Sequence, residues 1–174
     1  MGFFSRLFGG GDKQDSRHAT HNSHARIDTA ARARGISYDA SLIERLKNDH
    51  EDLVALYQKI GGLLESGKYG DIRSELVNFK TRFEAHILTE NVRFYVYLEQ
   101  QLQDSHNIEL MRDFRREMNT IARGVVEFVK KYQFTAFDAG LREQFAQDYR
   151  TVGGLLAQRI EREESSLYPL YQSG

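Results

Sequence analysis

Residues 72–97 decide the fold and read IRSELVNFKTRFEAHILTENVRFYVY. Their apolar side chains recur at steps of three and four, the spacing that keeps residues on one buried stripe of a helix. Two positions of that stripe hold His86 and Glu90, where a packed core would hold leucine. Buried histidine and carboxylate groups are costly unless a partner compensates them. The stretch therefore predicts a core helix that carries ligand-type residues, with Phe94 and Tyr97 continuing the stripe beyond them.

The same periodicity surrounds this helix, which we expect to run from about Asp71 to Gln103. A first helix opens at Asp39 or Ser41, both good N-caps, and ends near Glu65. Short connections make consecutive helices antiparallel, so residues 39–172 are predicted to form an all-α, up-down-up-down four-helix bundle. The expected stripes of the other three helices are Ile43, Leu46, His50, Leu53, Tyr57, Ile60 and Leu64; Met111, Phe114, Met118, Ile121, Val125, Phe128 and Tyr132; and Leu141, Phe145, Tyr149, Val152, Leu156, Arg159, Glu163, Leu167 and Leu170, closed by Pro169.

Ligand-type residues also interrupt the first and fourth stripes, at His50 and Glu163. His50 lies as far from the expected end of its helix as His86 lies from the expected start of the next. The two histidines should therefore stand at one level of the antiparallel pair. Glu90 follows one turn after His86 on the same face, an arrangement in which two side chains can hold one ion. The fourth helix returns beside the first, which brings Glu163 towards His50.

Composition narrows the possible functions. The chain has 174 residues, a formal net charge of −1 and no cysteine. Disulfides, thiolate metal sites and cysteine nucleophiles are thereby excluded. The charge gives no reason to expect nucleic acid as a partner, and no apolar run approaches the roughly 20 residues of a membrane span. We expect a cytoplasmic protein of bacterial type with no transmembrane segment; the sequence does not indicate its oligomeric state.

Residues 1–38 lack sustained periodicity and are expected to form a flexible N-terminal tail. Its apolar tip, GFFSRLF at residues 2–8, is either a mobile end or a docking peptide for a partner or a membrane surface. His18, His21 and His24 recur every three residues, so one helical turn could cluster them. In a flexible arm, solvated histidines are the simpler interpretation.

Three fragments resemble the hemerythrin-like, or HHE cation-binding, family. They read NDHEDL at residues 48–53, HILTE at residues 86–90 and IEREESSLYP at residues 160–169. The resemblance covers about residues 40–172. It implies two iron ions in the bundle core, each held by two histidines from neighbouring helices. Carboxylates from the second and fourth helices bridge the two ions.

When the family's metal ligands are matched to this sequence residue by residue, the ligands of only one of the two metal ions are present. His50, His86, Glu90 and Glu163 match every protein ligand of the first metal. The other two histidine positions hold Met118 and Arg159. A thioether is a soft, weak ligand and a guanidinium stays protonated, so neither replaces imidazole on iron. The resemblance therefore implies one iron or other divalent transition metal per chain, or none, and not an oxygen carrier.

Arg159 allows three interpretations because a core position normally expels a cation that lacks a carboxylate partner. It accompanies a single metal as a surrogate for the second ion and bridges Glu90 and Glu163. Alternatively, it balances both carboxylates together with protonated histidines in a metal-free bundle. In the third interpretation it points outward to solvent. Tyr57 and Tyr149 could approach the site or serve as core aromatics, and the run 161–164, Glu163 excepted, is interpreted as a solvated face.

Three functions remain open. The first is a non-catalytic metal-binding sensor or regulator. The second is a metal-free interaction module of the same fold, in which Arg159 replaces the metal charge and a protein partner binds the bundle surface or the N-terminal tip. The third is a mononuclear non-haem iron enzyme, which also needs open coordination positions and a substrate pocket. The sequence shows no sign of either requirement, so we do not expect an enzyme.

Overall fold

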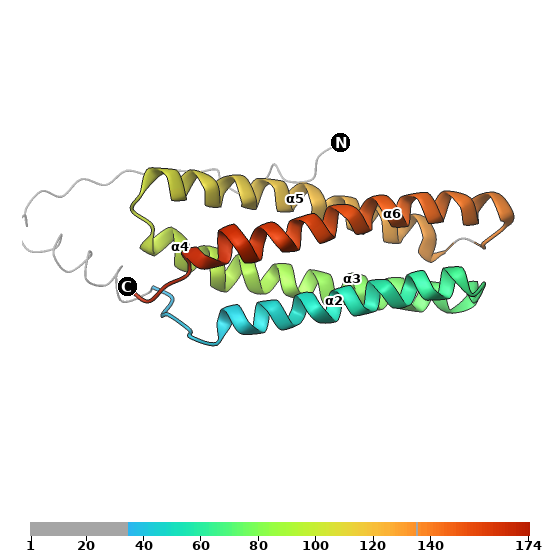
Figure 1. Ribbon diagram of the computed structural model, residues 1–174, viewed down its shortest axis with the longest axis horizontal. Coiled ribbons are helices and arrows are strands. Elements are labelled where there is room, and N and C mark those ends of the chain that lie inside the picture. Colours follow the sequence, from blue (N-terminus) through green and yellow to red (C-terminus); the bar gives the residue numbers. More distant parts are fainter. Residues whose placement is uncertain (1–34, 135) are drawn as a thin grey trace, which may run out of the picture. The chain divides into compact units, whose positions relative to one another are not determined.

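The structure is a computed structural model that describes residues 35–134 and 136–174. The described residues form four long helical segments and no strand, so the predicted all-α four-helix bundle is confirmed (Figure 1). Neighbours around the bundle are α2 with α3, α3 with α5, α5 with α6, and α6 with α2. The tip at residues 2–8 and the histidines His18, His21 and His24 lie outside the described residues.

Two of the four segments contain a change of helix type. The second continues without a loop from α3 into a π-helical turn and then α4, and the fourth continues from α6 into a π-helical turn and a short 3₁₀ turn. The elements are α2 (Leu42–Glu65), α3 (Tyr69–Thr89), η1 (Glu90–Phe94), α4 (Tyr95–Gln101), α5 (Ser105–Gln133), α6 (Ala139–Arg162), η2 (Glu163–Leu167) and η3 (Tyr168–Leu170).

The π-helical turns are the main departure from the expected continuous α-helices. The backbone N–H of Tyr95 bonds to the carbonyl of Glu90, and that of Tyr168 bonds to the carbonyl of Glu163, five residues back in each case. One extra residue per turn rotates the following side chains by about 100°. Adjacent residues are consequently both buried at two places, Phe94 with Tyr95 and Leu167 with Tyr168.

The turn from α2 to α3 shows how the sequence ends a helix. Gly67 has a φ of 69°, a left-handed conformation that glycine adopts without a side-chain clash. The N–H of Lys68 bonds to the carbonyl of Leu63, and the N–H of Gly67 bonds to that of Leu64. These two bonds satisfy carbonyls that the last turn of α2 would leave free, and they reverse the chain into α3.

A polar layer crosses the bundle between two apolar clusters. One cluster, with Leu53, Phe83 and Met118, lies towards the α2–α3 turn. The other, with Leu46 and Phe94, lies towards the opposite end. Among the described residues, the buried polar or charged ones fall between the clusters along their helices; they are His50, His86, Glu90, Arg159 and Glu163.

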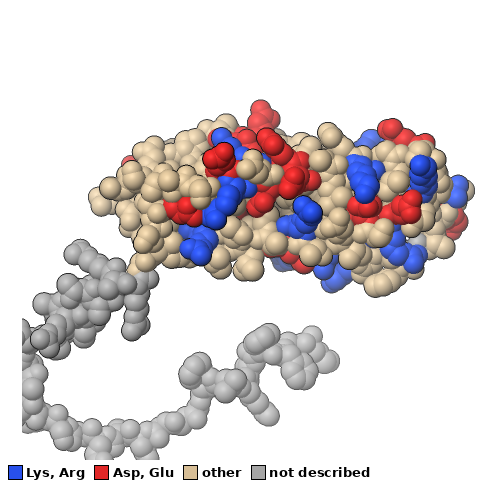
Figure 2. All heavy atoms as spheres, turned by 90° about the horizontal axis from the view of Figure 1, so that it is seen from below, with Lys and Arg blue, Asp and Glu red and all other residues tan. Residues whose placement is uncertain are grey.

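The surface gives a simple electrostatic picture. On the face drawn in Figure 2, acidic and basic side chains are intermixed among uncharged residues. In the part of the chain that the structure describes, no helix has the length and apolar character needed to cross a membrane.

Candidate metal centre

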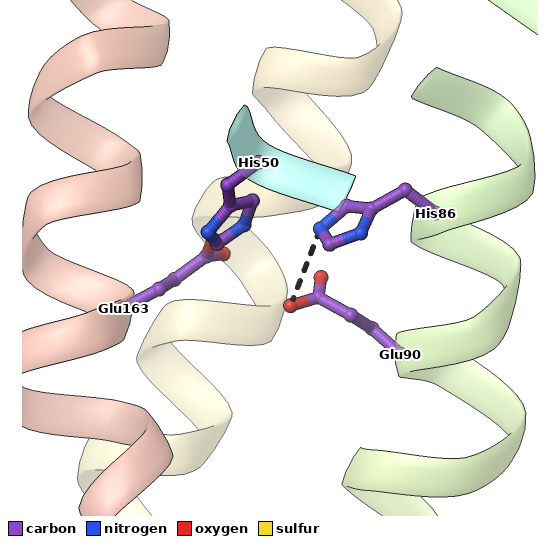
Figure 3. Close-up of side chains that lie close together, drawn as sticks. All are labelled: His50, His86, Glu90 and Glu163. Carbon is purple, nitrogen blue, oxygen red and sulfur yellow. Dashed lines mark ion pairs between the residues drawn. The ribbon is translucent and has the colours of Figure 1, made fainter. Parts of the chain in front are cut away.

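Three helical segments bring His50, His86, Glu90 and Glu163 together in the polar layer (Figure 3). Each of the four exposes between 1% and 4% of its surface. One ligand atom from each lies within 4.8 Å of those of the others, and the two imidazole rings are 4.7 Å apart. His50 belongs to α2 and His86 to α3, whereas each glutamate is the first residue of a π-helical turn.

Both histidines are oriented by a carboxylate behind them. Nδ1 of His50 lies 2.8 Å from Oε1 of Glu164, and Nδ1 of His86 lies 3.3 Å from Oδ2 of Asp49. An ionised carboxylate only accepts hydrogen bonds, so Nδ1 is the donor in each pair. Nε2 is the remaining ring nitrogen of each histidine. Metal-binding histidines commonly have this arrangement, because the outer carboxylate fixes the ring and raises its basicity.

Both glutamates are held through one oxygen. Arg159 donates from Nε to Oε1 of Glu163 over 2.5 Å, and the Tyr168 hydroxyl donates to Oε1 of Glu90 over 2.8 Å. Oε2 of Glu163 lies 3.3 Å from Nε2 of His50. By contrast, Oε2 of Glu90 and Nε2 of His86 are buried and find no hydrogen-bond partner in the described part of the chain. Such orphaned atoms are costly unless a ligand, water or ion completes them.

The two carboxyl groups differ in pKa. Burial raises the pKa of Glu90, and the nearby charge of Glu163 raises it further. Burial would also raise the pKa of Glu163, but His50 and Arg159 outweigh burial and lower it. Glu163 is therefore held as an anion, whereas a charged Glu90 is destabilised unless a cation arrives.

The two histidines differ in the same way. Burial would lower the pKa of His50, but its contacts with Glu163 and Glu164 outweigh burial and raise it. Burial lowers the pKa of His86, and the neighbouring His50 lowers it further. A neutral imidazole is the form that binds a metal, so His86 is ready to bind one, whereas a metal at His50 must displace a proton.

Arg159 points into the core, with 2% of its surface exposed, so the outward-facing interpretation is wrong. Besides Glu163, it donates from Nη1 to Glu117 over 3.1 Å and from Nη2 to the Tyr95 hydroxyl over 3.3 Å. Its guanidinium lies 4.6 Å from the centre of the Phe114 ring. No direct hydrogen bond to Glu90 is found among the described residues, so the expected bridge between Glu90 and Glu163 is replaced by one between Glu163 and Glu117.

The remaining sequence candidates are placed as follows. Met118 is buried in the apolar cluster beside the site. Tyr57 and Tyr149 stack with ring centres 4.5 Å apart, and each hydroxyl donates to the other residue's backbone carbonyl over 2.8 Å. Their hydroxyls therefore join α2 to α6 and are committed to backbone carbonyls, although the Tyr57 ring lines a cavity next to the site.

We call His50, His86, Glu90 and Glu163 the quartet. Sequence reasoning overlooked four residues around it, namely Asp49, Glu117, Glu164 and Tyr168. Glu164 corrects the interpretation of the run 161–164 as a solvated face, because it contacts His50. A signal for Tyr168 was available, since Glu90 and Glu163 are each followed five residues later by a tyrosine. No comparable signal marks Asp49 or Glu117, which lie beside stripe residues and not on the stripe.

The quartet fits a transition-metal ion. Imidazole nitrogen and carboxylate oxygen bind zinc, iron and related divalent ions at about 2.0–2.2 Å, so neighbouring ligand atoms around a tetrahedral ion are about 3.4 Å apart and ligands on opposite sides of an ion about 4.2 Å. The four ligand atoms lie within 4.8 Å of one another, so the side chains would close by roughly 1 Å around an ion. Among the described residues, three buried side-chain atoms lack a hydrogen-bond partner; two belong to the quartet and the third is Oε2 of Glu75. An ion at the quartet would complete the first two.

Comparison with known proteins agrees with this geometry. A model of the hemerythrin HHE cation binding domain matches residues 41–171. Searches of curated proteins and of solved structures found no significant match. The family match spans most of the 174 residues and includes all four members of the quartet. The chain therefore belongs to the hemerythrin HHE cation-binding domain family.

Proposed function

We propose that this protein is a regulatory metal-binding module that holds one transition-metal ion between His50, His86, Glu90 and Glu163. The observation that carries the proposal is the pair of orphaned buried atoms, Nε2 of His86 and Oε2 of Glu90. A carboxylate behind each histidine and a donor behind each glutamate leave at least one further ligand atom on every member of the quartet.

A single ion follows from the surroundings of Arg159. Its guanidinium bonds to Glu163, the carboxylate that would bridge a second ion in the family, and it carries a fixed positive charge. Met118, which stands at the other histidine position, offers only a thioether. The two-electron chemistry of an oxygen carrier needs two irons, so oxygen carriage is not proposed.

The regulatory role follows from where the donor atoms come from. The quartet belongs to three helical segments, and both glutamates begin π-helical turns. An ion would tie η1 and η2 to α2 and α3, whereas its loss would leave a buried carboxylate and a buried imidazole unsatisfied. Metal occupancy is thereby coupled to the geometry of these turns, which is the property a sensor requires.

A metal-free interaction module is the second candidate. It is favoured by the contacts that Glu163, Arg159 and His50 already make with one another without an ion. In such a module, Arg159 and a protonated His50 would supply the positive charge. The orphaned atoms of His86 and Glu90 favour the metal-binding function instead, because a completed polar network would not leave them without partners.

Metal analysis distinguishes these functions. Metal-free protein is loaded separately with Fe²⁺, Zn²⁺ and Mn²⁺ under anaerobic conditions, freed of excess ion and analysed for elements. We expect one ion per chain in the wild type, a sharp loss in His86→Ala, and no change in His106→Ala, a control in an exposed histidine on α5. Two tightly bound irons with an oxo-bridged absorption spectrum would overturn the single-ion proposal. A chain that retains none of the three ions would favour the interaction module.

Hydrogen exchange tests the regulatory part separately. Binding of the ion should slow amide exchange in Glu90–Phe94 and Glu163–Leu167 more than at the α5–α6 connection, which lies at the far end of the bundle (Figure 1). Exchange that is identical with and without a bound ion would leave metal binding in place but contradict a sensor that acts through the π-helical turns.

A further inference from the structure

A cavity of about 190 Å³ lies beside the metal quartet within the bundle. His50, His86 and Glu163 form part of its lining, but most of the wall is apolar and aromatic, including Leu53, Phe79, Phe83 and Met118. The exposed lining residues are Val54 and Gln58 on α2 and Ala157 on α6. The cavity therefore opens to solvent between α2 and α6.

Small residues on α6 account for the space. Gly153 and Ala157 line the cavity one turn apart, opposite Val54 and Tyr57 of α2. An alanine at Gly153 would bring its Cβ within 2.8 Å of the Tyr57 ring, so the two helices already touch there. Beyond that contact, the Ala157 side chain is too short to fill the gap. An unfilled apolar space costs stability, because the atoms of its wall lack packing partners.

The lining selects against a charged ligand. Two lining side chains can carry a positive charge, and both already have carboxylate partners: Arg159 donates to Glu163, Glu117 and the Tyr95 hydroxyl, and His50 contacts Glu163 and Glu164. An anionic group in the cavity would therefore have to compete with these carboxylates for either cation. It would also meet the carboxylate of Glu163. The charges of the lining therefore favour an uncharged ligand.

Size and shape favour a single aromatic ring. An engineered cavity of roughly 150 Å³ lined by leucine, isoleucine and phenylalanine binds benzene, whereas a diatomic gas fills only a small part of such a space. The Phe79 ring packs against Tyr57 at 5.1 Å and against Phe83 at 5.9 Å. Aromatic side chains of this kind give edge-to-face and offset contacts to another ring.

We propose that the cavity between α2 and α6 is a binding site for a small, uncharged aromatic molecule of the size of benzene or toluene. The ligand enters past Val54 and Ala157 and lies against Phe79, Phe83 and Met118. This site goes beyond the metal-binding function and does not depend on it, because the apolar wall is complete without an ion.

Titration of 4-fluorotoluene, followed by ¹⁹F nuclear magnetic resonance, tests the site in the metal-free full chain with a chelator present. The wild type should bind the probe saturably. Ala157→Phe places a ring in the mouth and should weaken binding by at least about 10-fold. Ala55→Phe, a control at an exposed alanine of α2 that does not line the cavity, should bind like the wild type. Circular dichroism establishes that each variant remains helical.

A second variant protects the test against misfolding of Ala157→Phe. Met118→Phe adds volume from the opposite wall and should also weaken binding of the probe. The proposal is overturned if the wild type shows no saturable binding, if helical Ala157→Phe binds as tightly as the wild type, or if 4-fluorobenzoate binds more tightly than 4-fluorotoluene. All measurements use metal-free protein, so failure here leaves the metal proposal intact. Conversely, the metal-binding result for His86→Ala has no bearing on whether the metal-free wild type binds 4-fluorotoluene.

Discussion

Segments η1 and η2 are both five-residue π-helical turns that begin at a buried glutamate and are followed directly by a buried tyrosine. Their surroundings differ. Glu163 of η2 receives a guanidinium nitrogen of Arg159 and lies beside His50. Within residues 35–134 and 136–174, Glu90 of η1 accepts a hydrogen bond only from the Tyr168 hydroxyl, and its second oxygen has no hydrogen-bond partner.

The two carboxylates obtain their charge compensation in different ways. On the η2 side the chain supplies its own cation, so the carboxylate is stable as an anion and its pKa is lowered. On the η1 side Nε2 of His86 lies 3.8 Å from Oε1 of Glu90, but burial lowers the pKa of His86 and so disfavours its cationic form. Burial also raises the pKa of Glu90. The chain thus supplies its own positive charge at Glu163 and leaves Glu90 without comparable compensation.

Glu163→Gln should have the largest effect on stability. It leaves the buried Arg159 with only Glu117 as a carboxylate partner, and breaking a buried ion pair typically costs 3–5 kcal/mol. We expect a loss of about 3 kcal/mol in the free energy of unfolding of the metal-free protein, measured in urea. Glu161→Gln, at an exposed position of the same helix, is the matched control. A loss no larger than that of the control would show that Glu163 is not compensated by Arg159.

Glu90→Gln should have the opposite effect: little change in the stability of the metal-free protein and a large loss of metal affinity. The amide oxygen still accepts the Tyr168 hydroxyl, and the buried charge is gone, so the metal-free protein should change by no more than about 1 kcal/mol. Metal affinity should fall by at least about 100-fold, because losses outside the ligand set alone cost 10–100-fold. Isothermal titration with Zn²⁺ measures the affinity, with exposed Glu84→Gln as the control. Strong destabilisation of the metal-free variant would break the contrast between the two glutamates.

Tyr168 and Tyr95, which follow the two π-helical turns, allow the same comparison with smaller expected effects. Tyr168 contacts Oε1 of Glu90 and lies 3.2 Å from Nε2 of His50, whereas Tyr95 contacts an arginine that retains two carboxylates. In metal-free protein, Tyr168→Phe should cost about 1–2 kcal/mol and Tyr95→Phe about 0.5 kcal/mol of unfolding free energy. Thermal and urea unfolding of the two variants side by side measure the difference. A larger loss of stability in Tyr95→Phe than in Tyr168→Phe would mean that the hydrogen bonds of Arg159 are less complete than those of Glu90.

Most of the fold and all of the quartet could be predicted from the sequence. Each helix shows its buried stripe directly, and His50, His86, Glu90 and Glu163 stand out because they interrupt those stripes. The π-helical turns were not predicted. A backbone N–H can bond to the fourth or the fifth preceding carbonyl, and both choices give the same buried stripe in the residues before the turn. The available signal is the adjacent apolar pair after each glutamate, because neighbours on a regular α-helix are about 100° apart.

The contacts around the quartet were harder to predict, for a physical reason. Asp49 precedes His50 in the chain but contacts His86 on the next helix, and Glu164 follows Glu163 but contacts His50. These pairings depend on how neighbouring helices rotate against each other, which the periodicity of a single helix does not determine. The cavity is a property of the assembled packing as well, and its sequence trace is limited to small residues on α6 such as Gly153 and Ala157.

The smallest expected effect concerns Asp148, which lies at the opposite end of the bundle. Its protonation contributes to the loss of stability in acid, and this contribution must be subtracted before the pH dependence is assigned to Glu90 and Glu163. Hydrogen bonds from Lys131 and Tyr132 hold the pKa of Asp148 below its ordinary value of 3.8. Because the pKa is lowered in the folded state, this stabilisation is fully present above 3.8 and is lost as the pH falls through the folded value. The Asp148 side chain is 38% exposed to solvent, which screens the interaction, so the loss should stay below about 1 kcal/mol. Urea unfolding between pH 2 and pH 6 should show a shallower acid decline in Asp148→Asn than in the wild type. Tyr132→Phe, which removes one of the two donors, should fall between them. Superimposable acid declines in all three proteins would show that Asp148 does not contribute, and the whole decline would then belong to other carboxylates.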